Sequence, residues 1–268
     1  MLEKPSYDIC SSRRSIKLSK RYVGTVFPTV GIHPFNADPK LLSTDLNCYN
    51  KPFVTLMRET ELQLNNIILT EPVKGIGETG LDYSSGFPDK KFQLPLFELH
   101  ITQAIKHKLP LFIHERLAFT DCAKTLFSCL KKLRRAFNDE TLCLPPTLIH
   151  CFTGTSEELK QYISYGFYVS ISGFIKRTKA GEELRRALKK GLVPLDKLMI
   201  ETDAPYMGFA GCRSDLRYLE GIGAEKQYPN VPAALLKVVS ALAESLNLPV
   251  KEVMAHTTAN AKKFFNIA

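Results

Sequence analysis

Four side chains of the kinds that bind metal ions, Glu78, His114, His150 and Asp203, each follow a short apolar stretch of the sequence. Two imidazoles and two carboxylates suit a divalent cation of intermediate hardness, such as Zn²⁺, Mn²⁺ or Mg²⁺. Ions of this kind lower the pKa of water and stabilise negative charge on phosphoryl oxygens. The residue types therefore predict a site for a divalent metal ion.

The segment that organises this prediction is residues 75–83, GIGETGLDY. Its apolar lead-in, residues 72–76, predicts a buried strand, and we expect that strand to end at Glu78 and to be followed by a turn. Glycines on both sides of Glu78 allow the backbone to bend tightly and bring the carboxylate to the mouth of a sheet. Taken alone, Glu78 would be interpreted as a solvated loop residue; the recurrence of the pattern downstream favours a site.

Apolar runs and helical periodicity alternate along the chain. We expect strands at residues 25–32, 72–76, 109–113, 147–149, 168–171 and 197–200, with a weaker one at 6–10. We expect helices at residues 11–22, 52–64, 119–137, 178–190, 235–246 and 250–265, one starting at Pro88-Asp89 and one opened by a Thr155–Glu158 capping box. His100, His107 and His256 are interpreted as surface residues of helices.

This alternation predicts an α/β fold with a parallel sheet, and its length favours a TIM-like (β/α) barrel in a single domain spanning residues 1–268. A doubly wound open sheet is the alternative, but the sequence has no Gly-rich dinucleotide loop. In a barrel, the strand ends place His33, Glu78, His114, His150 and Asp203 at one rim, where catalytic residues of this fold lie.

The composition of the chain indicates the cellular compartment and the kind of partner. Lys and Arg number 36 against 27 Asp and Glu, a net charge of +9, which favours a polyanionic partner such as nucleic acid. No apolar run reaches the roughly 18 residues of a membrane span, so no membrane association is expected. The seven cysteines are scattered without a C-x-x-C pair, and we expect reduced thiols in a cytoplasmic or nuclear protein.

Five segments, GIGETGLDY, FIHER, LIHCFTGT, SISGF and LMIETDAPY, resemble in their order the TatD family of metal-dependent deoxyribonucleases. The resemblance extends over residues 8–265. It implies a TIM-barrel, two-metal hydrolase that hydrolyses phosphodiester bonds of DNA, as a 3′–5′ exonuclease. The sequence does not favour one oligomeric state over another.

The resemblance also implies roles for individual residues. Glu78 matches the metal-bridging glutamate, His114 and His150 match histidine ligands, and Asp203 matches the aspartate of the last strand, catalytic together with Glu78. His33 lies in a G-x-H-P motif near the substrate phosphate. The remaining two roles follow from residue type: Arg116 is expected to bind substrate by stabilising phosphoryl charge, and Glu201 to orient metal ligands from a second layer.

The chain departs from the family pattern at several places. The family's first strand, with its H-x-H ligands, has no counterpart, so we expect a barrel that is incomplete at the N-terminus and a truncated form of the protein. Phe35 stands where the family has the second histidine of H-P-H, residues 115–119 replace C-R-D-A-H, and residues 227–229 replace an N-E-P-like segment. These changes lie on the expected substrate side.

Two other functions compete with a nuclease. One is a metal hydrolase of the same superfamily that acts on a small molecule. The other is a catalytically impaired form that still binds nucleic acid without its first strand. The basic run at residues 131–135 is interpreted as a solvated helix end, with phosphate contact as the alternative.

Overall fold

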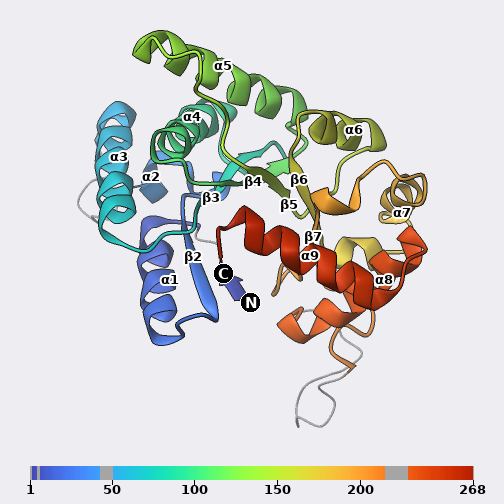
Figure 1. Ribbon diagram of the computed structural model, residues 1–268. Coiled ribbons are helices and arrows are strands. Elements are labelled where there is room, and N and C mark those ends of the chain that lie inside the picture. Colours follow the sequence, from blue (N-terminus) through green and yellow to red (C-terminus); the bar gives the residue numbers. More distant parts are fainter. Residues whose placement is uncertain (1, 5–6, 43–50, 215–228, 268) are drawn as a thin grey trace. The chain divides into compact units, whose positions relative to one another are not determined.

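The computed structural model describes residues 2–4, 7–42, 51–214 and 229–267. The chain divides into two compact units, Met1–Thr147 and Leu148–Ala268. Figure 1 shows the elements of both.

The first unit alternates parallel strands with helices. Its strands β1 to β4 pair in the order of the chain, β1 with β2, β2 with β3 and β3 with β4, all parallel. The elements are β1 (Leu2–Lys4), α1 (Ile9–Arg21), β2 (Val26–Val30), η1 (Pro34–Asn36), α2 (Pro39–Leu42), α3 (Phe53–Thr70), β3 (Gly75–Asp82), α4 (Lys90–His107), β4 (Leu111–Arg116) and α5 (Phe119–Phe137).

The second unit repeats the pattern with three strands, again parallel and in chain order. Strand β5 starts at the last residue of the first unit. The elements are β5 (Thr147–His150), α6 (Ser156–Ser164), β6 (Tyr168–Ile171), η2 (Gly173–Lys176), α7 (Glu182–Lys189), η3 (Leu195–Lys197), β7 (Leu198–Ile200), η5 (Pro232–Ala234), α8 (Leu235–Leu246) and α9 (Val250–Phe264).

Strand order distinguishes the two folds that the sequence left open. A doubly wound sheet reverses its order at a switch point, whereas a barrel winds in one direction. In each unit the order follows the chain without reversal. The TIM-like (β/α) barrel fold is therefore confirmed. The described residues form seven strands, where a complete barrel has eight.

Two capping boxes decide where helices begin. The Thr155–Glu158 box opens α6 as predicted, with both reciprocal hydrogen bonds present. A second box joins Asp8 and Ser11, where the Asp8 side chain accepts from the Ser11 backbone N–H at 2.5 Å. The predicted strand at residues 6–10 is therefore wrong in its described part, because a capped helix starts at Ile9. Helix α7 is also shorter than predicted and begins at Glu182.

Strand β3 extends further than the sequence suggested. It runs through Asp82, so the prediction that the strand ends at Glu78 and is followed by a turn is wrong. The pairing of β3 with β4 is irregular between Ile76 and Thr79, and it is regular again from Thr79 to Asp82. A glycine-rich segment usually predicts a turn. Here Gly80 lies in a strand, and glycine is needed because a Cβ at this position would lie 1.9 Å from the His114 carbonyl oxygen.

The prediction that His100, in helix α4, is a surface residue is wrong. His100 is fully buried, its Nε2 accepts a hydrogen bond from the Ile32 backbone N–H at 3.0 Å, and its Nδ1 donates to the Leu96 carbonyl at 2.7 Å. Its ring therefore joins α4 to the end of β2. His256 on α9 is exposed, as predicted, and His107 is half-buried.

Among the described helices, none is by itself long and apolar enough to cross a bilayer, although Pro232–Leu246 and Val250–Phe264, bent by 109°, meet that test as a pair.

Candidate metal and catalytic site

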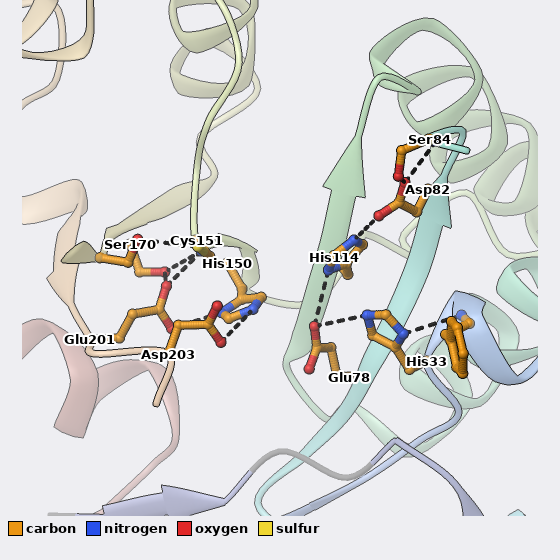
Figure 2. A network of polar contacts seen from close by, with 12 residues as sticks. His33, Glu78, Asp82, Ser84, His114, His150, Cys151, Ser170, Glu201 and Asp203 are labelled. Atoms are coloured by element: carbon orange, nitrogen blue, oxygen red, sulfur yellow. Dashed lines mark hydrogen bonds and ion pairs between the residues drawn. The ribbon is translucent and has the colours of Figure 1, made fainter. Parts of the chain in front are cut away.

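Two predicted site histidines of the first unit face the same carboxylate oxygen of Glu78. Glu78 Oε1 lies 3.3 Å from His33 Nε2 and 3.1 Å from His114 Nδ1. One nitrogen or oxygen from each of the three residues lies within 4.8 Å of the others. Figure 2 shows both rings directed at Glu78, from the end of β2 and from β4. This set of donors has the composition of a metal site.

The register of β3 against β4 explains why His114 reaches two carboxylates. His114 pairs with Gly80, which has no side chain, and Glu78 and Asp82 lie two residues before and after Gly80. Alternate residues of a strand point to the same face, so both carboxylates flank the imidazole. His114 Nε2 lies 2.8 Å from Asp82 Oδ2, opposite the Glu78 contact of Nδ1 (Figure 2).

Asp82 is a site residue that sequence reasoning missed. Its side chain is fully buried, and its Oδ1 accepts hydrogen bonds from the Ser84 backbone N–H at 2.9 Å and from the Ser84 hydroxyl. Burial raises the pKa of the Asp82 carboxyl, but hydrogen bonds from His114 and Ser84 outweigh burial and hold this pKa below its ordinary value. The signal was available, because a strand continued to Asp82 places it on the same face as Glu78.

The tautomer of His33 follows from a local hydrogen bond. His33 caps the short helix η1, and its Nδ1 accepts from the Phe35 backbone N–H at 3.1 Å. A ring nitrogen that accepts a hydrogen bond carries no proton, so Nε2 carries it. His33 therefore presents an N–H donor at Glu78, whereas His114 Nδ1 is the nitrogen of this cluster better suited to a cation.

The second unit forms a cluster of its own around His150. The imidazole is 4% exposed; its Nδ1 lies 2.7 Å from Glu201 Oε2, and its Nε2 lies 3.8 Å from Asp203 Oδ1. Glu201 Oε1 also accepts from the Cys151 backbone N–H and the Ser170 hydroxyl, each at 2.6 Å. The Glu201 carboxylate is thus anchored by β5 and β6, and it fixes the orientation of His150 (Figure 2).

The segment after β7 holds Asp203 in an uncommon backbone conformation. Asp203 has φ = 56°, in the left-handed region where non-glycine residues are rare. Asn230, which is 3% exposed, braces this segment: its side-chain amide donates to the Thr202 carbonyl at 2.8 Å, and its backbone N–H donates to the Pro205 carbonyl. Asn230, followed by Val231-Pro232, was missed by the sequence analysis, which placed the N-E-P-like segment at residues 227–229, largely outside the described residues.

Both clusters share one arrangement of imidazole and carboxylate groups. In each, one imidazole nitrogen faces a carboxylate oxygen while the other nitrogen is held by a second carboxylate. The 3.8 Å between His150 Nε2 and Asp203 Oδ1 is too long for a hydrogen bond. It is shorter than the sum of two typical ligand distances, about 4 Å. The carboxylate–histidine arrangement is the one that orients metal-binding imidazoles in proteins.

Two further predictions concern surface residues. Arg116 is exposed at the end of β4 and pairs in the strand with Asp82. The basic run on α5 borders a groove of about 410 Å³ lined by Phe127, Leu130, Lys131, Arg134, Arg135 and Glu140. Arg134 Nε donates to the Leu142 carbonyl at 2.8 Å, which ties one of these cations to the chain that follows the helix.

A comparison with known proteins gives one consistent result. The sequence profile of the TatD-related DNases matches residues 4–266. A protein of Buchnera aphidicola described as an uncharacterized metal-dependent hydrolase is 31% identical over 251 residues, covering 94% of this chain and 81% of its own. The 3′–5′ ssDNA/RNA exonuclease TatD of Citrobacter koseri is 30% identical over 257 residues, covering 96% and 84%.

The solved structures agree on the fold. The crystal structure of a TatD homologue from Escherichia coli superimposes with a TM-score of 0.73 at 22% identity, covering 99% of this chain and 86% of that one. At this identity the likeness concerns the fold alone.

Proposed function

Because the chain belongs to the TatD-related DNase family, and is thus a hydrolase of the TatD type, we propose that it is a divalent-metal-dependent nuclease. Its proposed reaction is hydrolysis of phosphodiester bonds in DNA, as a 3′–5′ exonuclease. The relatives named as 3′–5′ ssDNA/RNA exonucleases support this reaction.

The observation that carries the proposal is that His150 lies between two carboxylates, Glu201 at Nδ1 and Asp203 at Nε2. Glu201 occupies Nδ1 at 2.7 Å, which directs the lone pair of Nε2 toward Asp203. An imidazole oriented by one carboxylate and facing another is a metal-ligand arrangement. An ordinary buried histidine, such as His100, instead has both nitrogens hydrogen-bonded to the backbone.

The proposed ligands are Glu78, His114, His150 and Asp203, which would hold one or two divalent ions. When bound, such ions supply Lewis-acid stabilisation of phosphoryl oxygens and lower the pKa of water. Asp203 would orient the attacking water and accept its proton, since its carboxylate is held by a braced backbone. Glu78 would share in catalysis by positioning the reacting groups, and Glu201 would fix His150.

Substrate binding is assigned to residues that can still donate or stack. His33 Nε2 carries a proton, so it can donate to a phosphate oxygen, and the exposed guanidinium of Arg116 can neutralise phosphate charge. Phe87 packs edge-to-face against Phe35, with ring centroids 5.6 Å apart, and Phe35 is 52% exposed beside His33. An exposed aromatic ring of this kind is a surface for an unpaired base, which favours single strands.

The net charge of +9 supports a polyanionic substrate. The cysteines of the described residues form no disulfide, which supports a cytoplasmic location; a nuclear one is the alternative.

The experiment is a cleavage assay with single-stranded DNA labelled at its 5′ end, in Mg²⁺ or Mn²⁺, with and without a chelator. We expect shortening from the 3′ end that the chelator abolishes. Glu78→Ala and His150→Ala should abolish cleavage while DNA binding persists, and His256→Ala, an exposed histidine outside both clusters, should cleave normally.

The outcomes separate this function from its competitors. Binding without cleavage by the wild type would favour the catalytically impaired nucleic-acid-binding form. Neither binding nor cleavage of DNA, together with metal-dependent turnover of a small ester, would favour the small-molecule hydrolase. Undiminished cleavage by both site variants would overturn the assignment of the ligands.

A further inference from the structure

Asp82 forms a buried contact that the proposed reaction does not yet use. Its Oδ2 lies 2.8 Å from His114 Nε2, and its side chain is fully buried. Its other oxygen accepts two hydrogen bonds from Ser84, so each carboxylate oxygen has a defined partner. These contacts fix the orientation of the Asp82 carboxylate, with Oδ2 toward His114 and Oδ1 toward Ser84.

The backbone of Asp82 is fixed as firmly as its side chain. Gln93 of α4, which is 1% exposed, accepts from the Asp82 N–H at 2.8 Å and donates to the Asp82 carbonyl at 2.7 Å. The same Gln93 amide nitrogen also lies 2.6 Å from the Pro88 carbonyl. This clamp occupies both main-chain groups at the end of β3, so Asp82 cannot turn away from the imidazole without breaking buried hydrogen bonds.

Chemistry then decides the proton on His114. An ionised carboxylate only accepts hydrogen bonds, and His114 lies between two of them, with Nε2 2.8 Å from Asp82 and Nδ1 3.1 Å from Glu78. The shorter contact, to an Asp82 side chain that is fully buried, favours the proton on Nε2. In a neutral imidazole protonated at Nε2, the other nitrogen, Nδ1, carries the lone pair, and Nδ1 is the atom that faces Glu78 at 3.1 Å. With the proton on Nδ1 instead, the ring would present a lone pair to Asp82 and could not bind a cation beside Glu78.

We propose that Asp82 is a positioning residue that holds His114 in the tautomer protonated at Nε2, so that Nδ1 and Glu78 bind one divalent ion. This inference rests on the proposed function for the ion, but the tautomer itself does not depend on it. Asp82 is not a ligand in this account; it acts only through His114.

The sharpest variant is Asp82→Asn, which keeps the shape of the side chain. The Ser84 donors would hold the amide oxygen at the Oδ1 position, so the amide NH₂ would face His114 Nε2 and donate to it. The proton would then move to Nδ1, the nitrogen intended for the metal. We expect Mn²⁺ affinity, measured by isothermal titration calorimetry, to fall by about 10- to 100-fold, the usual range for such partners.

Two further variants separate this effect from loss of packing. Asp82→Ala removes the acceptor but introduces no donor, so we expect a smaller loss of Mn²⁺ affinity than in Asp82→Asn. Asp89→Asn makes the same chemical change at the exposed N-cap of α4, where Asn caps as well as Asp. It should bind Mn²⁺ like the wild type. An Asp82→Ala loss equal to or larger than that of Asp82→Asn would overturn the proposal.

A second readout does not require metal or activity. Nitrogen NMR of the histidine rings in the metal-free protein, at a pH where they are neutral, should show His114 protonated at Nε2 in the wild type and at Nδ1 in Asp82→Asn. A wild-type His114 protonated at Nδ1 would overturn the inference even if the variant failed to fold. Absence of chelator-sensitive cleavage with the expected tautomers would instead count against the proposed function alone.

Discussion

At the scale of the residue, histidines differ by what their two ring nitrogens contact. His100 has both nitrogens bonded to backbone groups, and it joins α4 to β2. His114 and His150 each have one nitrogen held by a carboxylate and the other directed at a second carboxylate. Burial is common to His100 and His150, so burial alone does not distinguish a structural histidine from a candidate ligand.

His100 leads to a prediction about acid stability. Burial lowers the pKa of His100 from 6.5 to about 4, so below pH 6.5 the unfolded chain binds a proton that the folded chain does not. Stability from this group is complete above pH 6.5 and is lost as the pH falls toward 4, by about 3 kcal/mol in total. Urea unfolding at several pH values measures the effect.

The control is His100→Gln, whose side-chain oxygen can still accept from Ile32 but does not titrate. We expect the wild type to lose more stability than this variant between pH 7 and pH 4. Equal losses in the two proteins would contradict a neutral, buried His100.

The candidate ligands could be identified from the sequence. The carboxylates that hold the second ring nitrogen of each histidine could not all be identified. Sequence order placed His114 and His150 in or at the ends of strands, since apolar runs precede them. The partners of these rings, Asp82 and Glu201, depend on strand register and on how far β3 continues. Glu201 was expected to orient ligands because it stands near Asp203; Asp82 was overlooked because GETG reads as a turn.

At the scale of the element, strand β3 depends on glycine at Gly80. Its φ of 140° and the 1.9 Å from a Cβ at this position to the His114 carbonyl oxygen leave no room for a side chain. Regular pairing from Thr79 to Asp82 shows that the close approach of β4, not a turn, is what the glycine permits. The spacing of Glu78, His114 and Asp82 follows from this approach.

Gly80→Ala should therefore be strongly destabilising. We expect a loss of about 3 kcal/mol or more, from an unfavourable backbone conformation and from overpacking, each about 1–3 kcal/mol. Gly86→Ala is the matched control, because Gly86 has φ = 90° but nothing lies within 4 Å of its Cβ position. The Gly86→Ala variant should lose only the part of the unfolding free energy that comes from the unfavourable backbone conformation. Similar unfolding free energies for the two variants would contradict the packing argument.

Helices were easier to predict than this strand. The Thr155–Glu158 box and the apolar stripe of α5 are local signals, and both helices start where those signals place them. The start of α1 was missed because its box uses Ser11 as the reciprocal partner instead of Glu or Gln. Helix starts that depend on local hydrogen bonds could thus be predicted from the sequence. The end of β3 could not, because it depends on pairing with β4, which is distant in sequence.

At the scale of the whole molecule, alternation of strands and helices was enough to predict the barrel fold. Strand order in each unit and the family match bear this out. The single domain over residues 1–268 stays a prediction. The nuclease function, the metal ligands and the DNA substrate are proposals that share one premise: the histidine–carboxylate clusters bind divalent ions.

Metal content per chain tests that premise most directly. Wild-type protein dialysed against Mn²⁺ and analysed for metal should hold one or two ions, and Glu78→Ala and His150→Ala should each hold fewer, while His256→Ala matches the wild type. Wild-type protein with no bound Mn²⁺ above background, or variants that retain the full content, would contradict the account.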